Sequence, residues 1–251
     1  MSGHSKWATI KHKKAATDAK RGRVFTRLIR EISIAARAGG ADPDVNPRLR
    51  TAIASAKAEN MPNDNIERAV LRGIGQLEGE QFEEAMFEGY GPGGVGILVQ
   101  TVTSNRNRCV GEIRHAMSKH GGNMAEAGAV GWMFHRKGDI VVPKELAGEE
   151  KMMNIVLDAG AEDLHDDGST WEVITPPEAF DAVRDALAAA GITPASAEIG
   201  WIPQNYIKLT GSEAQQMIRL VEALEEHDDV QQVYANFDVD EKEIQAAVAA
   251  G

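Results

Sequence analysis

The most informative stretch of this chain reads Gly89-Tyr90-Gly91-Pro92-Gly93-Gly94-Val95-Gly96 and runs directly into Ile97-Leu98-Val99-Gln100-Thr101-Val102. Its glycines match the spacing G-x-G-x-x-G twice, which is the spacing of a dinucleotide-binding turn. That turn requires a helix after the glycines, whereas a strand-like run follows here. The Gly-Lys-Ser/Thr sequence of a nucleotide-triphosphate loop is also missing. Since residues 82–90 have strand character too, the stretch predicts the turn of a β-hairpin.

The sequence after the hairpin predicts a second α/β unit. From residue 133 the pattern predicts elements in the order β-α-β-β-α-β, which is the ferredoxin-like order. The expected segments are 138–142, 145–159, 161–165, 170–175, 177–190 and 195–203.

This unit interrupts another one. Residues 82–132 supply two strands and a helix, which cannot close a sandwich alone. The segment 206–240 supplies a further helix and strand. We therefore expect residues 133–205 to be a domain inserted into a discontinuous domain, which is formed by 79–132 and 206–245.

The segment 22–78 predicts a three-helix domain. Apolar residues recur at helical spacing, and Gly39-Gly40 ends the first helix. Asn46, followed by a proline, predicts the N-cap of a second helix. Asp64 and Glu67 resemble a capping box at the start of a third. The expected fold class is therefore α+β, with this helical domain followed by two α/β sandwich domains, the last inserted into the middle one.

The net charge of −11 over 251 residues hides a strong polarity along the chain. Residues 1–72 hold 15 Lys or Arg against 7 Asp or Glu, residues 73–144 hold 7 against 8, and residues 145–251 hold 5 against 23. A basic head and an acidic tail predict that the two ends face different partners. We expect a polyanion at the head. The acidic last third either meets a protein partner or limits non-specific binding to polyanions.

Composition excludes several classes of protein. The chain is 43% apolar and 26% charged, as folded domains are. No run of about 18 apolar residues predicts a membrane-spanning helix, and residues 1–6 lack the apolar run of a secretory signal. Because Cys109 is the only cysteine, an internal disulfide and a cysteine-rich zinc site are excluded. We expect a cytoplasmic protein without a membrane partner.

Residues 1–21 predict a flexible basic arm that orders on a partner. Nine of the first 30 residues are Lys or Arg and one is acidic. A solvated tail that aids solubility would carry the same charge. Trp7 lies inside the basic run, however, and an exposed indole stacks on nucleic-acid bases. The arm is thus a candidate nucleic-acid contact.

Further basic residues extend this candidate surface. Five of them recur at spacings of three, four, three and seven, which predicts one stripe opposite the apolar side of the first helix: Lys20, Arg23, Arg27, Arg30 and Arg37. Arg106 and Arg108 lie in the first turns of a helix capped by Ser104 or Asn105, where a bound polyanion would offset their repulsion by the helix dipole. Two solvated arginines are the alternative. The predicted nucleic-acid-binding residues are Lys6, Trp7, Lys11, His12, Lys13, Lys14, Lys20, Arg21, Arg23, Arg27, Arg30, Arg106 and Arg108.

The sequence offers little for catalysis. Cys109 follows Arg108 near a helix start, which would lower a thiol pKa, but no neighbour in sequence activates it, and a small core residue is the simpler interpretation. The aspartates within 163–167 fit a solvated turn better than a metal site. The histidines match no zinc motif, and no G-x-S-x-G, kinase or paired-carboxylate motif is present. We expect no enzyme, no cofactor and no metal.

Several unusual strings in this chain resemble the YebC/PmpR family. They are Gly3-His4-Ser5-Lys6-Trp7, Ile10-Lys11-His12, Lys13-Lys14, Asp42-Pro43, Asn46-Pro47-Arg48-Leu49-Arg50, Asn60-Met61-Pro62-Asn63-Asp64-Asn65-Ile66, Glu88-Gly89-Tyr90-Gly91-Pro92-Gly93-Gly94 and Asn105-Arg106-Asn107-Arg108. The resemblance spans nearly the whole chain. One departure is Ala125, where the family tends to have glycine.

The resemblance implies a three-domain cytoplasmic protein that is a DNA-binding transcriptional regulator and is unlike any enzyme class. It also implies an alternative. A mitochondrial relative is a translational activator, and some bacterial members are linked to ribosomes stalled on proline-rich nascent chains.

The residues themselves leave both partners open. The basic stripe suits backbone binding better than base readout by a recognition helix. An arm of Lys, Trp and His suits structured RNA, so duplex DNA and ribosomal RNA are both candidates. The sequence predicts no particular oligomeric state.

Overall fold

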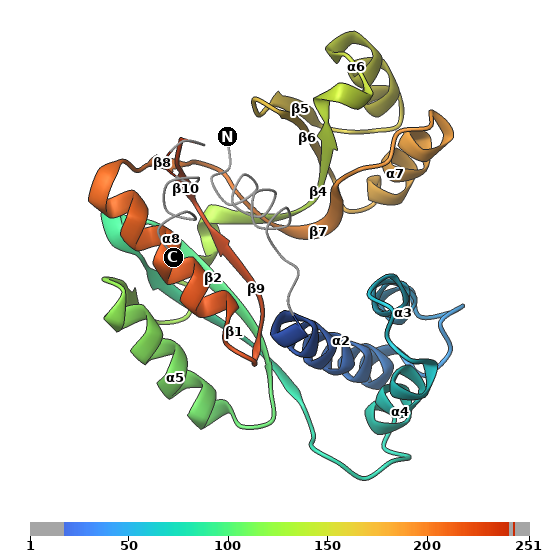
Figure 1. Ribbon diagram of the computed structural model, residues 1–251, viewed down its shortest axis with the longest axis vertical. Coiled ribbons are helices and arrows are strands. Elements are labelled where there is room, and N and C mark those ends of the chain that lie inside the picture. The colour runs from blue at the N-terminus through green and yellow to red at the C-terminus, as the bar shows by residue number, and fades with distance from the viewer. Residues whose placement is uncertain (1–17, 241–242, 244–251) are drawn as a thin grey trace.

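The chain folds into a helical domain and two four-stranded sheets, which form three lobes, and a short parallel sheet of two strands lies near the C-terminal end of the described residues (Figure 1). The computed structural model describes residues 18–240 and 243, with the backbone alone for residues 18–21. The helices are α2 (Asp18–Gly39), α3 (Pro47–Ala58), α4 (Asn63–Gly73), α5 (Arg106–Lys119), α6 (Glu149–Asp158), α7 (Phe180–Ala189) and α8 (Gly211–Glu225). The strands are β1 (Glu83–Tyr90), β2 (Gly96–Thr103), β3 (Asn123–Met124), β4 (Phe134–Pro143), β5 (Asp163–Asp166), β6 (Thr170–Thr175), β7 (Ser196–Pro203), β8 (Ile207–Lys208), β9 (Val230–Ala235) and β10 (Phe237–Asp238). The predicted α+β class is confirmed.

The helical domain, α2 to α4, packs around a small core that includes Ile32 and Leu49. Asn46 is the predicted N-cap of α3: its side-chain oxygen accepts from the Leu49 N–H, and its amide donates to the Ala35 carbonyl. The capping box predicted at Asp64 is wrong. The N-cap of α4 is Pro62, and no side-chain cap bond forms there. Proline already fixes its own φ, so the chain enters the helix without that bond.

The first sheet has the strand order β3-β1-β2-β9 and carries α5 and α8 on one face. The predicted hairpin is confirmed: β1 and β2 are antiparallel, and Tyr90 pairs with Gly96 at its closed end. The turn places Gly93 and Gly94 at φ +71° and +79°, where residues with a Cβ are strained. Glycine is therefore required by the turn and not by a nucleotide.

The second sheet has the strand order β5-β6-β4-β7, and every neighbouring pair is antiparallel. With α6 after β4 and α7 after β6, this is the ferredoxin-like arrangement that the element order predicts. Its core includes Ile140, Met152, Trp171 and Leu187. The chain enters this unit after the first sheet has begun and returns through α8 and β9 to complete that sheet, so the second unit is inserted into the first.

Glu88 on β1 anchors the connection between the two sheets. Its carboxylate accepts hydrogen bonds of 2.7 Å from the backbone N–H groups of Gly128, Val130 and Gly131, immediately before β4. Desolvation raises the pKa of Glu88, but these three bonds together outweigh it and hold the pKa below the ordinary value. The ionised side chain therefore fixes where the inserted unit leaves the first sheet.

We expect Glu88→Gln to destabilise the protein by about 1–3 kcal/mol at pH 7, because the substitution removes hydrogen bonds to a charged acceptor. The folded-state pKa of Glu88 is lowered, so this contribution is present above the pKa of an unfolded glutamate. It disappears as the pH falls through the lowered pKa. Urea unfolding at pH 7 and at decreasing pH measures it. Glu83→Gln, at an exposed site on the same strand, is the matched control. If the free energies of unfolding of the intact protein and of Glu88→Gln differ by the same amount at every pH, this role of Glu88 is contradicted.

Candidate nucleic-acid interface

The structure divides the predicted binding residues into two groups. The residues of the arm lie outside the described part of the chain: Lys6, Trp7, Lys11, His12, Lys13 and Lys14. Lys20 and Arg21 lie in the first turn of α2, for which the backbone alone is described. The remaining five, Arg23, Arg27, Arg30, Arg106 and Arg108, can be placed with their side chains.

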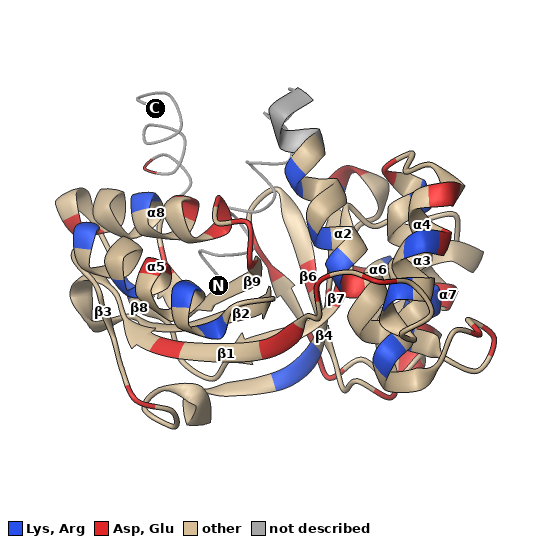
Figure 2. Ribbon diagram, turned by 90° about the horizontal axis from the view of Figure 1, so that it is seen from below, with Lys and Arg blue, Asp and Glu red and all other residues tan. Residues whose placement is uncertain are grey.

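The arginine stripe of α2 faces protein. Figure 2 shows acidic segments at the end of α8 and the start of β9 beside the basic segments of α2. Arg23 lies 3.7 Å from Glu226, and the burial of Arg27 lowers its guanidinium pKa while the acidic residues around it act in the opposite direction. The expectation of a stripe on the open side of the helix is thus corrected, because the acidic end of α8 covers part of it.

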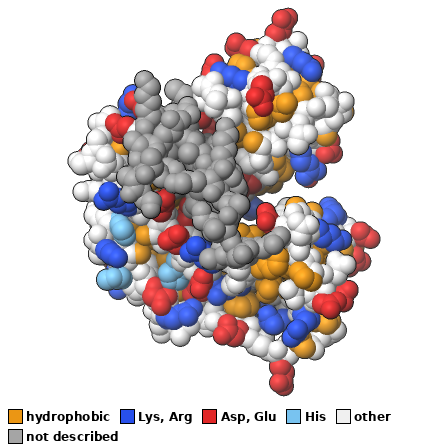
Figure 3. Space-filling view, in the orientation of Figure 1, with side chains coloured by type: hydrophobic (Ala, Val, Ile, Leu, Met, Phe, Trp, Pro, Cys, Tyr) orange, Lys and Arg blue, Asp and Glu red, His pale blue; other side chains and the backbone are white. Residues whose placement is uncertain are grey.

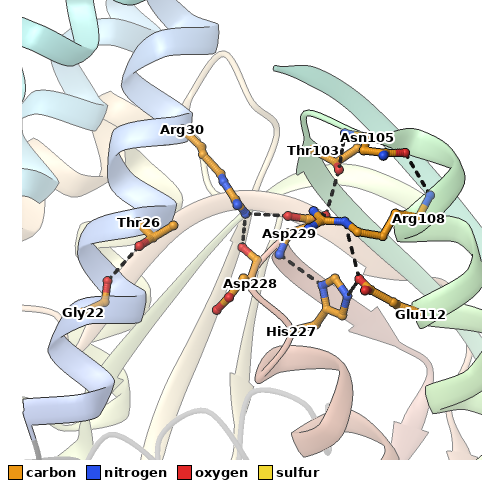
Figure 4. A network of polar contacts seen from close by, with 10 residues as sticks. All are labelled: Gly22, Thr26, Arg30, Thr103, Asn105, Arg108, Glu112, His227, Asp228 and Asp229. Carbon is orange, nitrogen blue, oxygen red and sulfur yellow. Dashed lines mark hydrogen bonds and ion pairs between the residues drawn. The ribbon is translucent and has the colours of Figure 1, made fainter. Parts of the chain in front are cut away.

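Arg30 lies in the centre of this contact (Figure 4). Its Nη1 is 2.9 Å from Oδ1 of Asp229 and also donates to the Asp228 carbonyl. Its guanidinium lies over the Phe82 ring, 5.5 Å from the ring centre. The Arg30 side chain is 11% exposed and that of Asp229 is 1% exposed. A guanidinium held in this way is not available to a phosphate, so Arg30 stabilises the docking of the helical domain on the first sheet.

Arg108 binds the same carboxylate from α5. Its Nη2 donates to Oδ2 of Asp229 at 2.7 Å, and Thr103 at the end of β2 donates to the same oxygen at 2.8 Å. The N-cap is Asn105, whose side chain accepts from the Arg108 N–H at 3.1 Å. Half of the Arg108 side chain remains exposed. It is therefore neither a solvated arginine nor a free anion ligand, and Asp229 offsets its repulsion by the helix dipole.

His227 and Glu112 complete the network. Nε2 of His227 lies 2.8 Å from Glu112, and Nδ1 accepts from the Asp229 N–H at 3.1 Å. Together with Asp229, these side chains bring three ligand atoms within 4.8 Å of one another, as a metal site would. Two guanidinium groups already neutralise Asp229, and Nδ1 is already used. The geometry therefore favours an ion-pair network over a bound cation.

Cys109 lies behind this network in the core of the first sheet. Burial raises the pKa of its thiol to about 11, and nearby Asp229 adds to the effect. The thiol is therefore protonated at neutral pH, which suits the core residue that the sequence predicts and not a nucleophile.

Asp229 is the important residue that the sequence analysis missed. It follows two other polar residues, His227 and Asp228, and resembles a solvated turn. The local sequence contains no sign that this carboxylate is buried. A buried acid is recognised by its partners, and those lie on α2, α5 and β2, far from it in the chain.

Comparisons with known proteins agree with this architecture. Residues 5–76 match the TACO1/YebC protein N-terminal domain, and residues 82–237 match the TACO1/YebC second and third domain.

The chain belongs to the TACO1/YebC family.

This confirms the resemblance that the sequence strings indicate. This chain is 63% identical to a probable transcriptional regulatory protein of Solibacter usitatus, over 98% of this chain and 99% of that protein. It is 56% identical to a protein of the same description from Carboxydothermus hydrogenoformans, over 95% and 99% of the two chains. A solved structure, of a conserved hypothetical protein from Aquifex aeolicus, superposes with a TM-score of 0.80 at 47% identity, covering 89% of this chain and 92% of that one. Among the described helices of this TACO1/YebC chain, none has both the length and the hydrophobicity of a membrane span.

In this TACO1/YebC protein, Arg30→Met is expected to destabilise the fold by about 3 kcal/mol, because it removes one partner of a buried carboxylate. Arg23→Met is the matched control: its pair with Glu226 is solvent-exposed and contributes less than about 1 kcal/mol. Urea unfolding of both variants measures the difference. Equal effects would show that Asp229 does not depend on Arg30.

Proposed function

We propose that this protein is a nucleic-acid-binding regulator of transcription that contacts DNA mainly through its N-terminal arm. The observation that carries the proposal is the concentration of cations there. Residues 1–17 contain Lys6, Lys11, Lys13 and Lys14, together with Trp7 and no acidic residue. Relatives that match almost the whole chain are described as probable transcriptional regulatory proteins, which supports the same function.

The contacts of the helical domain support a main role for the arm. Arg30 is occupied by Asp229, and Arg23 and Arg27 face the acidic end of α8. Phosphate contacts supply most of the sequence-independent affinity for nucleic acid, through the release of counterions. We infer that the arm supplies most of this affinity.

The proposal contains no catalytic step. The cysteine thiol is buried, with a raised pKa. The cluster of histidine and carboxylates is occupied by ion pairs with two arginines. The description of the relatives as regulators agrees with a binding role.

Replacing Lys11, Lys13 and Lys14 by Ala is expected to weaken binding to a 20-base-pair DNA duplex. The slope of log Kd against log salt should fall by up to about three units, one for each phosphate that the variant no longer neutralises. Fluorescence anisotropy between 50 and 200 mM salt measures both quantities. The control carries Ala at Lys151, Arg184 and Lys208, three exposed cations on other elements, and removes the same charge. Equal weakening in the two variants would show that net charge alone matters.

Crosslinking in cells, followed by sequencing of the bound DNA and RNA, tests the target. The expected result is enrichment of particular promoter DNA with the intact protein and no such enrichment with the triple-alanine arm variant. Enrichment of ribosomal RNA at one location instead would overturn the proposal in favour of a translation factor, which the arm also suits through stacking on single-stranded bases.

A further inference from the structure

A second cationic surface lies on the first sheet unit, on helices that are far from the arm in the sequence. The outer side of α5 carries exposed Arg106, Arg114, His115 and Lys119. The one acidic residue of this helix, Glu112, lies 3.9 Å from Arg108 and 2.8 Å from His227. The exposed side of α5 is therefore net positive, although the residues that follow it in the chain are strongly acidic.

Three of these cations are spread along the length of α5. Arg106 is its first residue, Arg114 lies near its middle and Lys119 is its last residue. From Arg106 to Lys119 the helix is about 20 Å long, at about 1.5 Å per residue. One strand of a duplex has a phosphate about every 3.4 Å along its axis, so this length matches about six phosphates.

The neighbouring helix α8 adds one more cation. Arg219 is exposed on α8, and α5 and α8 cover the same face of the first sheet. His120, at the end of α5, has a lowered pKa, first from burial and then from the positive charges of Lys119 on α5 and Arg219 on α8. Figure 3 shows blue and pale-blue side chains gathered along the edge where α5 and α8 lie.

The cations on this surface differ from those on α2 in their partners. Within the described part of the chain, Arg114, Lys119 and Arg219 form no ion pair or side-chain hydrogen bond, whereas Arg30 and Arg108 are both paired with Asp229. Glu225 and Glu226, the acidic residues at the far end of α8, lie beside α2. Unpaired, solvated cations gain most from a polyanion, because no internal ion pair has to break first.

We propose that the outer face of α5, with Arg219 of α8, is a second binding surface for the sugar–phosphate backbone of the nucleic acid. The proposal rests on the nucleic-acid-binding function proposed above and adds a contact on a different part of the molecule. Contacts to the phosphates from two separate cationic segments fix the orientation of the protein on the nucleic acid, which the contacts of one segment alone do not. The contact is to phosphates and therefore carries no base preference.

The test compares Lys119→Gln/Arg219→Gln with Lys151→Gln/Arg184→Gln. Each pair removes two exposed positive charges, and the second pair lies on α6 and α7 of the inserted unit. The probes are a 20-base-pair DNA duplex and an RNA duplex of the same length, titrated by fluorescence anisotropy from 50 to 200 mM salt. Thermal melting checks that both variants fold like the intact protein, which is expected because all four side chains are exposed.

The proposal predicts at least about fivefold weaker binding at 100 mM salt for the α5–α8 variant, and a salt slope lower by up to about two units. The control should stay within twofold of the intact protein. Weakening with DNA alone or RNA alone identifies which backbone the surface fits, and weakening with both supports general phosphate contact.

Two results would overturn the inference. If the α5–α8 variant binds like its control while the triple-alanine arm variant is weakened, the surface is not used and the proposed function still stands. If the intact protein binds neither duplex in a salt-dependent way, the proposed function and this surface fail together.

Discussion

The buried carboxylate of Asp229 holds the helical domain against the first sheet. A charge away from water is destabilising by several kcal/mol unless it is paired and hydrogen-bonded. Its oxygens contact Arg30 from α2, Arg108 from α5 and Thr103 from β2. All three partners are present only when the three elements meet in this arrangement. The small apolar contact beside it, formed by Ile34, Phe82 and Val102, adds area to the interface but fixes orientation less strictly.

The basic residues of the head therefore fall into two groups: those that form contacts within the protein, and those that a bound polyanion can reach. Arg48 of α3 bridges Glu31 of α2 and Glu84 of β1, and Arg37 donates to the Phe82 carbonyl at 2.8 Å. Like Arg30, these residues join the helical domain to itself or to the first sheet. A count of charges along the sequence therefore overstates what a polyanion can reach. Part of the positive charge of the head and part of the negative charge of the tail therefore pair with each other, where α2 contacts the end of α8.

The sequence is a good guide to elements and a poor one to charged contacts. Periodicity and the glycine turn predict the helical domain, the hairpin and the ferredoxin-like order, because these depend on local spacing. The cap at Asn46 is predictable for the same reason. The position of Arg30 is not, because a helical stripe of arginines has the same pattern whether it faces water or a distant acid. The Asp64 cap fails because the helix begins at Asn63, with Pro62 as its N-cap.

The insertion of one α/β unit into another is possible because its two ends lie together. Phe134, at the start of β4, pairs with Pro203, at the end of β7, so the inserted chain leaves and returns at the same place. The strands of the first sheet therefore do not have to separate to accommodate the inserted unit. The last strand of the first sheet, β9, pairs directly with β2. Phe134 also packs with Leu98, Val130 and Tyr234 on the face of the first sheet opposite α5. That face is thus partly covered by the inserted unit and the helical domain, and on the other face of the sheet it is the outer sides of α5 and α8 that meet solvent.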